Sequence, residues 1–393
     1  MNLPRETPVT AEPLTFLAVA DVEIVEPDPL EHFRLVKPLF DVADLLFGQL
    51  EVPLSNVGEH QLHGGIANRG WDKDALKGAR ALRDIGFDVM SHASNHTMDM
   101  SESVLLETMA AVEQESKIQL IGVGRNIDEA RRPAVVEVGG TRFGFLAYCS
   151  VPIKNSWAER RLLPDGNVVD RGGVNPLRAF TYYQEVDYQP GNKPRIVTQT
   201  RPEDLAAMIA DIEALRRQVD VLVVSQHWGV HFESATIAMY QIEAAHAAID
   251  AGADLILGHH PHTIKGIEYY RGKAVFYGMP NFNLAVRDQH EERSAEWTTL
   301  ESEKSFIAKM VVTEKAISRV SIIPCHLDYT TRQPTPLPAC DPRAEEIRRY
   351  LEWADRHNTP DFWRGTGVTR AFPAFNTVYR FEGDEILVLP SGT

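Results

Sequence analysis

The sequence predicts a layered α/β sandwich built around one main domain. Short apolar runs typical of buried strands alternate with segments whose apolar residues recur at helical spacing, and hairpins follow late in the chain. In addition, metal-binding residue types follow several of the strands, as they do at the active-site edge of open α/β sheets. At 393 residues the chain is long enough for one large core or two domains.

The predicted elements have recognisable ends. Gly86 stops the second helix, and the third opens at Ser101 with a capping-box-like pattern. The first hairpin turns at Gly139-Gly140. The predicted strands are residues 14–20, 44–50, 87–91, 118–123, 219–225 and 253–257. The predicted helices are residues 29–42, 73–86, 101–115, 202–218, 236–251 and 341–356, and the predicted hairpins are residues 133–148, 263–277, 306–324 and 377–389.

Residues 150–200 break this rhythm because they are polar, aromatic and rich in glycine and proline. Fifty residues of weak periodicity inside an α/β pattern predict an insertion, which we interpret as a lid over a substrate site. The main domain is then residues 1–330, with the insertion inside it. Residues 331–393 are predicted to add a helix and a hairpin that pack on the main domain as a C-terminal extension.

Composition and charge exclude several classes of protein. The formal net charge of −15 argues against a nucleic-acid or anionic-membrane partner. No apolar run approaches the roughly 18 residues of a membrane span, and the N-terminal residues do not resemble a signal peptide. Cys149, Cys325 and Cys340 are too far apart to suggest a disulfide framework or a zinc ribbon. We therefore expect a cytoplasmic protein with a small-molecule or peptide substrate, and the oligomeric state stays open.

Side chains that can bind metal follow five of the predicted strands. One acid after a strand is weak evidence, because strand ends are often polar for solubility, but five cases that draw on Asp, Glu, Asn and His are hard to explain in that way. The mixed oxygen and nitrogen donors suit two divalent ions such as Mn, Zn, Fe or Co rather than Ca. These side chains are Asp21, Glu51, Asn95, His96, His227, His260 and His262.

The remaining histidines near these positions have less specific interpretations. His260 and His262 alternate across one residue, so both can face the same side of a loop. His259, between them and the preceding strand, is predicted to point away and to be structural. His92 is predicted to pack in the core or behind the ligands. His231 is either a binding residue at the rim or a surface residue.

The motifs that carry these residues resemble those of the capsule-synthesis family (CapA-type, poly-γ-glutamate biosynthesis), part of the calcineurin-like metallophosphoesterase superfamily. The resemblance covers roughly residues 14–330 and implies a four-layer α/β/β/α sandwich. The matching motifs are Ala20-Asp21, Gln49-Leu50-Glu51, Ser94-Asn95-His96, His227-Trp228-Gly229, Gly258-His259-His260-Pro261-His262 and Asn281-Phe282.

The same resemblance implies roles for individual residues. Glu51 would be the carboxylate that bridges two metal ions, and His96 would be the general acid. Asp99 would orient His96 if this stretch begins a helical turn. The implied metal ligands are Asp21, Glu51, Asn95, His227, His260 and His262.

This sequence departs from the family pattern beside the ligands rather than at them. Ala20 stands where the family has Gly, Gln49 where it has Asn, His231 where an acid is common, and Pro280 where it has Gly. Many members are also membrane-anchored, whereas no anchor is evident here. We interpret these changes as those of a specialised member that acts on something other than a capsule polymer.

Three functions are compatible with the sequence. The first is a dimetal hydrolase that cleaves a phosphoester or a γ-glutamyl or peptide-like bond with a metal-activated water. The second is a metal-dependent peptide epimerase that moves a proton at an α-carbon with the same residues. The third is a non-catalytic accessory protein of polyglutamate synthesis. Metal content separates the third function from the first two, which the sequence alone does not separate.

Overall fold

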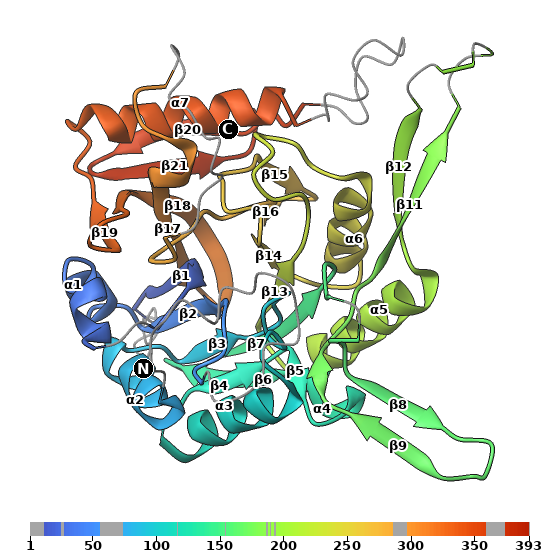
Figure 1. The fold of residues 1–393 in the computed structure, drawn as a ribbon. Helices are drawn as coiled ribbons and strands as arrows, with labels where there is room; N and C mark the ends of the chain where they lie inside the picture. The colour runs from blue at the N-terminus through green and yellow to red at the C-terminus, as the bar shows by residue number, and fades with distance from the viewer. Residues whose placement is uncertain are drawn as a thin grey trace, which may run out of the picture.

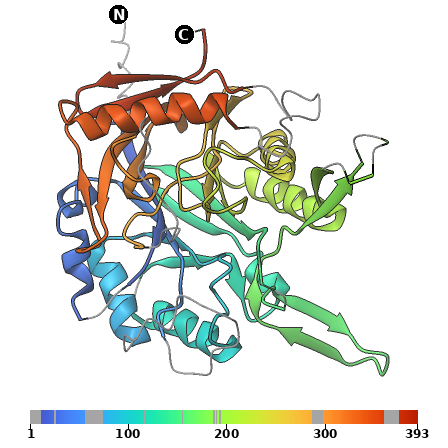
Figure 2. The ribbon, with the colours of Figure 1, turned by 45° about the horizontal axis from the view of Figure 1, so that its top comes forward.

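The computed structural model shows two β-sheets packed face to face, with helices outside them (Figures 1 and 2). No helix in the described part of the chain is both long and apolar enough to cross a membrane. The described residues are 12–24, 27–55, 74–115, 117–153, 155–185, 188, 190–191, 194–285, 297–358 and 374–392.

The first sheet has nine strands among the described residues, in the order β20-β21-β18-β17-β1-β2-β3-β4, with β19 paired to β18. Strands β1 to β4 run parallel to one another, and β17 and β18 continue the sheet in antiparallel pairs. The bounds are β1 Leu14–Val22, β2 Leu45–Leu50, β3 Val89–Ser91, β4 Gln119–Ile121, β17 Lys304–Thr313, β18 Ala316–Asp328, β19 Gln333–Pro336, β20 Val378–Glu382 and β21 Glu385–Leu389.

The second sheet has the strand order β15-β16-β14-β13-β7-β6. Its central strands β7, β13, β14 and β16 are parallel, so their carboxyl ends lie at one edge. The bounds are β6 Ala134–Val138, β7 Thr141–Cys149, β13 Val221–His227, β14 Leu255–His259, β15 Ile267–Tyr270 and β16 Lys273–Phe276.

Helices cover the outer face of each sheet and complete the four layers. Helix α2 packs on the first sheet and α3 beside it, whereas α5 and α6 pack on the second sheet. This arrangement confirms the predicted α/β/β/α sandwich. The helices are α1 Lys37–Phe40, α2 Ala75–Ile85, α3 Glu102–Glu115, α4 Ile127–Ala130, α5 Pro202–Arg216, α6 Met239–Asp250 and α7 Pro342–Arg356, with 3-10 helices at Pro29–Phe33 and Glu301–Glu303.

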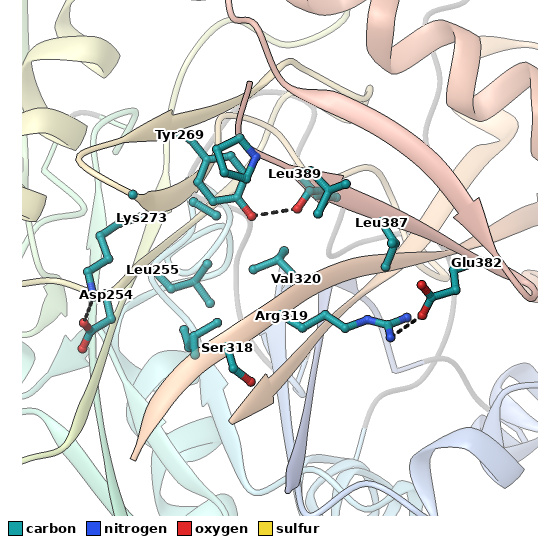
Figure 3. A pocket seen from close by; sticks show the side chains of 15 residues that line it. Asp254, Leu255, Tyr269, Lys273, Ser318, Arg319, Val320, Glu382, Leu387 and Leu389 are labelled. Carbon is teal, nitrogen blue, oxygen red and sulfur yellow. Dashed lines mark hydrogen bonds and ion pairs between the residues drawn. The ribbon is translucent and has the colours of Figure 1, made fainter. Parts of the chain in front are cut away.

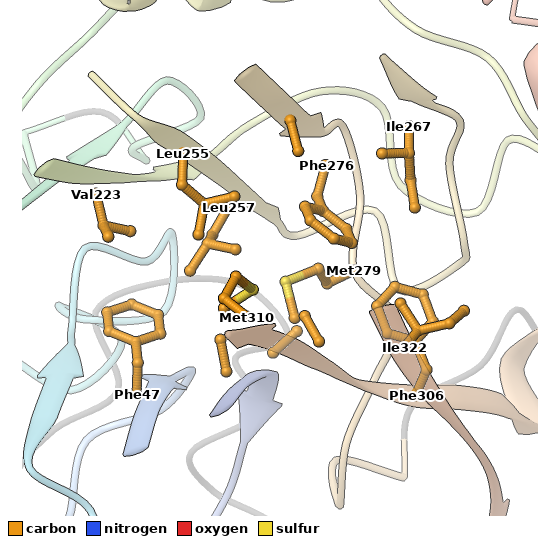
Figure 4. Packing of buried hydrophobic residues seen from close by; sticks show 14 of the residues in the cluster. Phe47, Val223, Leu255, Leu257, Ile267, Phe276, Met279, Phe306, Met310 and Ile322 are labelled. Atoms are coloured by element: carbon orange, nitrogen blue, oxygen red, sulfur yellow. The ribbon is translucent and has the colours of Figure 1, made fainter. Parts of the chain in front are cut away.

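The core between the sheets is apolar and follows from strand alternation. Phe47 and Met310 of the first sheet face Val223 and Leu257 of the second (Figure 4). Their sequence neighbours face outward, as Ile256 does toward α6. Because both faces of each central strand are buried, the strands read as near-continuous apolar runs.

The C-terminal residues contribute to the first sheet. Strand β21 pairs with β18 through Ser321 and Ile322, and α7 lies over β20 and β21 (Figure 1). Buried Asp355 of α7 accepts hydrogen bonds from the Ile267 backbone N–H and the Tyr379 hydroxyl. The division of the chain into residues 1–330 and 331–393 stays a prediction.

The segment predicted as an insertion folds mainly as two hairpins that project from the body of the molecule in both views (Figures 1 and 2). Their tips expose apolar side chains, including Leu162 at 71% and Tyr183 at 73%. The role of this segment as a lid stays a prediction. Its strands are β8 Glu159–Leu162, β9 Val168–Arg171, β10 Gly173–Val174, β11 Ala179–Gln184 and β12 Arg195–Thr200; β10 pairs with β5, Val123–Gly124.

Two predicted elements are wrong in detail, and one strand of the first sheet was missed. The helix predicted over residues 29–42 is two short pieces, because Pro38 lacks the N–H that a continuous helix needs there. The strand predicted over 118–123 is split at Gly122, whose φ of 78° interrupts the extended backbone and whose added Cβ would lie 2.6 Å from Ala93 Cβ. Strand β19 was not predicted, because two of its four residues are prolines.

Candidate metal centre

The ligand-type residues come from both sheets and meet where parallel strands end. Asp21 is the second-to-last residue of β1, and Glu51 directly follows β2. His227 is the final residue of β13 rather than a loop residue, because that strand runs two residues further than predicted. The remaining members lie in the loops after β3 and β14: Asn95, His96, His260 and His262.

Four of these side chains form one group. Glu51, His227 and His260 each offer a ligand atom within 4.8 Å of the others, and all three are buried. Asn95 Oδ1 lies 2.7 Å from His227 Nε2 and 3.2 Å from His260 Nδ1. Glu51 Oε2 lies 3.6 Å from His227 Nδ1. This cluster could bind a metal ion.

A second group adjoins the first. Asp21 Oδ2 lies 3.1 Å from His262 Nδ1, and the same nitrogen lies 2.8 Å from Asn281 Oδ1. Asp21 also raises the pKa of Glu51 through charge repulsion, so the two carboxylates are near neighbours. The structure thus brings the six predicted ligands into two groups and adds Asn281 to the second.

The loop after β14 has an unusual backbone that presents two histidines to the cluster. His260 has φ of 90° and His262 has φ of 59°, both in the left-handed region that L residues seldom adopt. The preceding Gly258 is tightly enclosed, since an added Cβ would lie 2.5 Å from the Phe276 carbonyl oxygen. Backbone strain of this kind concentrates at functional sites.

The electrostatics of the cluster favour a bound cation. The Asp21 and Glu51 side chains are both fully buried; Asp21 faces His262 at 3.1 Å, and the Ser94 hydroxyl is a hydrogen-bond partner of Glu51. Burial, and then repulsion by Asp21 and Asp99, raises the pKa of Glu51 well above its usual value. Burial also lowers the pKa of His227 and His260, so these rings are neutral and can act as ligands. The donor set therefore fits a divalent metal ion.

His96 is held beside the cluster by its own turn. Its Nδ1 donates to Asp99 Oδ2 at 2.8 Å, and its Nε2 lies 3.9 Å from Glu51 Oε1. The Ser94 hydroxyl accepts the His96 backbone N–H at 3.0 Å and fixes the start of the turn. Asp99 thus lies where the sequence-based interpretation required it, in hydrogen-bond contact with His96.

The other histidines near the cluster have distinct environments. His92 Nδ1 lies 2.9 Å from the Leu50 carbonyl oxygen, a contact within the core behind the ligands. His259 is buried and stacks on Phe47 at 6.0 Å between ring centroids. His231 is exposed, and its ring meets that of His260 edge to face at 5.0 Å. His231 therefore lies at the rim of the cluster.

Sequence reasoning missed three further features near the centre. Asn281 was recognised as part of the Asn281-Phe282 motif, but no role was predicted for it. That motif was the signal that could have indicated a residue of the site. Glu23 is buried and pairs with Arg332 at 2.9 Å. Lys265 is buried three residues after His262, and nothing in the sequence distinguishes it from a surface lysine.

A crevice of about 460 Å³ lies away from the cluster, at the start of β14 rather than its end (Figure 3). Tyr269, Val320 and Leu387 line its middle. Its cations are paired within the chain: Lys273 with Asp254 at 2.6 Å and Arg319 with a glutamate of β20. The crevice shares no residue with the metal-binding cluster.

A buried carboxylate and histidine cluster at the strand ends of an α/β/β/α sandwich defines a candidate metalloprotein. Residues 18–285, more than half of the chain, match the family described as Bacterial capsule synthesis protein PGA_cap. The chain therefore belongs to this family, which confirms the resemblance found in the sequence.

Two relatives with named roles show how similar the chain is to other proteins in sequence. The chain is 25% identical over 251 residues to the PGA biosynthesis protein CapA of Bacillus subtilis, an alignment that covers 64% of this chain and 56% of that protein. It is 35% identical over 239 residues to a probable polyglutamine synthesis accessory protein of Mycobacterium tuberculosis, covering 60% of this chain and 54% of that one. The chain thus spans little more than half the length of these relatives.

Solved structures show a distant likeness. The calcineurin-like phosphoesterase YfkN from Bacillus subtilis aligns with a TM-score of 0.40 at 9% sequence identity, over 88% of this chain and 97% of that chain. A hypothetical protein from Thermus thermophilus aligns with the same TM-score at 14% identity, over 80% of this chain and 98% of that chain.

Proposed function

We propose that this chain is a divalent-metal-dependent hydrolase that cleaves a phosphoester or a γ-glutamyl or other peptide-like bond. The observation that carries the proposal is the placement of His96, oriented by Asp99 and 3.9 Å from Glu51 at the edge of a cluster suited to a metal ion. A protein that only bound polyglutamate would need neither an oriented imidazole nor six converging ligands. A cytoplasmic location stays a prediction.

We propose two ions, drawn from Mn, Zn, Fe and Co, because the ligands form two adjoining groups. Glu51, Asn95, His227 and His260 would hold one ion, and Asp21 and His262 the other, with Glu51 shared between them. Bound there, such ions lower the pKa of water and neutralise the negative charge that develops during hydrolysis.

The residues of the chain supply the proton transfer. The Asp99 carboxylate accepts the Nδ1 proton of His96, which leaves Nε2 as the atom that gains or loses a proton. His96 would donate that proton to the leaving group, the role of a general acid. His231, exposed on the rim beside His260, would contact an entering substrate.

A substrate panel in heavy water tests this proposal. The manganese-loaded protein is incubated with bis(4-nitrophenyl) phosphate, γ-glutamyl-4-nitroanilide and short poly-γ-glutamate peptides, and the products are analysed by mass spectrometry. We expect cleavage of at least one substrate class, with no deuterium at an α-carbon. Deuterium incorporation without cleavage would indicate the epimerase instead. Binding of the peptides without any reaction would favour an accessory role, the function that the name of the mycobacterial relative suggests.

Shortening the β8–β9 hairpin tests whether residues 150–200 select the substrate. We expect replacement of residues 161–169 by a short Gly/Ser bridge to leave fold and metal content unchanged, because Leu162, Val168 and Val169 are exposed at 71%, 56% and 43%. If the segment is a lid, turnover of a long peptide substrate falls while bis(4-nitrophenyl) phosphate is cleaved as before. If both substrates are turned over as fast as by the wild type, this hairpin takes no part in substrate selection.

A further inference from the structure

The loop of residues 229–236, between β13 and α6, lies directly on the histidine loop of residues 258–262. The Phe232 backbone N–H donates to the Pro261 carbonyl oxygen at 3.0 Å. The Phe232 ring stacks on His262 at 5.2 Å and 30°, next to the edge-to-face contact of His231 with His260. The position of His231 over the cluster therefore depends on how the 229–236 loop is held.

This loop adopts a conformation that its own residues do not favour. Phe232 has φ of 62° and Ala235 has φ of 54°, values in the left-handed region that side-chain-bearing residues seldom adopt. Residues with strained backbone persist only where the surroundings fix them. Contacts outside the loop must therefore hold it against the histidine loop.

Lys265, in the segment that follows the histidine loop, supplies such a contact. Its ammonium group donates to the Glu233 carbonyl oxygen. Its side chain fills the space between the two loops and β16, because a Cβ added at Gly278 would lie 2.5 Å from Lys265 Cγ and 3.0 Å from Pro261 Cγ. At the outer side, the Ser234 hydroxyl donates to Glu301 at 2.7 Å.

Burying this lysine has a cost that a purely structural role does not require. Lys265 is 1% exposed, and burial lowers the pKa of its ammonium group to about 8, opposed by the charges of Glu301 and Glu233. An apolar side chain of the same length would fill the same space without this cost. What the ammonium group adds is a charged hydrogen bond to the strained loop.

We propose that Lys265 is a positioning residue that clasps the 229–236 loop to the histidine loop, and that His231, placed in this way, binds an anionic oxygen of the substrate. The second part rests on the proposed function. The His231 ring is exposed beside His260 at the rim of the cluster, and the Lys265 ammonium group holds the same loop through the Glu233 carbonyl oxygen. Both features favour a substrate with a phosphate or carboxylate group beside the reacting bond.

The test compares Lys265→Met with Lys304→Met as a matched control. Lys304 is equally buried at 1%, but its ammonium group pairs with Glu346 of α7. Hydrogen–deuterium exchange of residues 229–236 and metal content are measured for both variants. We expect faster exchange of the Phe232 amide, by tenfold or more, only in Lys265→Met, with metal content unchanged. Unchanged exchange in that variant, or equal acceleration in both variants, would show that Lys265 does not hold the 229–236 loop against the histidine loop.

Kinetics test the second part. With whichever probe the manganese-loaded protein cleaves, we expect His231→Ala and Lys265→Met each to raise KM roughly tenfold, the cost of one lost hydrogen bond, while kcat changes little. The double variant should be no worse than His231→Ala alone, since both changes remove one contact. Additive effects, or an equal loss with γ-glutamyl-4-nitroanilide and its α-carboxamide analogue, would overturn anion binding by His231.

A second variant keeps the clasp testable if Lys265→Met does not fold. Ser234 is exposed, so Ser234→Ala is tolerated and removes only the outer contact of the loop to Glu301. We expect at most a small acceleration of Phe232 amide exchange in this variant, because the Lys265 contact remains. An acceleration of tenfold or more would show that the contact to Glu301, rather than Lys265, holds the loop, and would overturn the proposal. If no probe is cleaved by the wild type, the proposed function fails, but the exchange data still decide the role of Lys265.

Discussion

Replacing Glu51 with glutamine will abolish the stabilisation of the protein by divalent metal. Glu51 is fully buried in the group with His227 and His260, and the Asp21 carboxylate is near enough to repel its charge. Wild-type protein gains about 2.7 kcal/mol when the metal concentration is 100 times its Kd, because metal binds only the folded state. In Glu51→Gln this gain disappears, and turnover falls by more than the roughly 10–100-fold that loss of an outer hydrogen bond costs.

The metal-free proteins provide a second comparison. Glutamine cannot ionise, whereas burial makes the ionised form of Glu51 costly, so metal-free Glu51→Gln should be at least as stable in urea as metal-free wild type. Glu23→Gln is the matched control: its carboxylate is equally buried but paired with Arg332, so the same change should cost about 3 kcal/mol and leave the metal effect intact. Retention of the full metal-dependent stabilisation by Glu51→Gln would contradict its assignment as a ligand.

The second large effect is expected for His96→Asn. We expect turnover to fall roughly 10²–10⁴-fold, the usual span for a general acid or base, with metal content unchanged. The reason is geometric: His96 Nε2 lies 3.9 Å from Glu51, outside the set of atoms that converge on one another. Metal content and kcat are measured on the same preparation.

Asp99→Asn separates orientation from proton transfer. This variant keeps His96 but loses the carboxylate that fixes its tautomer, so we expect a smaller loss of roughly 10–100-fold. If His96→Asn loses its metal together with its activity, His96 is a ligand and its assignment as the acid is wrong. If the Asp99→Asn loss equals that of His96→Asn, the two residues act as one unit.

The sequence predicted those features that depend on local pattern. Each buried strand is an apolar run, and a metal-binding side chain at its end, such as Glu51 after β2, is visible without knowing what lies next to it. The layers followed from the alternation of strands and helices. The hydrogen bond between His96 and Asp99 was also accessible, because it needs only one turn of backbone.

Features that depend on packing between distant segments were not predictable. The contact of Asp21 in β1 with His262 in the loop after β14 joins residues 241 positions apart, and no periodicity encodes it. Lys265 is buried only because Gly278 leaves room for its side chain. The left-handed backbone of Phe232 is likewise imposed from outside, since nothing in an aromatic residue favours it.

The central claim is that the buried cluster is a divalent metal centre, and metal analysis of the purified protein tests it most directly. Protein purified without chelator, dialysed and then analysed by inductively coupled plasma mass spectrometry should hold one to two equivalents of Mn, Zn, Fe or Co. The same treatment of His260→Ala should leave a folded protein with less than half of that amount. Folded wild-type protein with less than a tenth of an equivalent of every divalent metal, before and after incubation with each of them, would contradict the account.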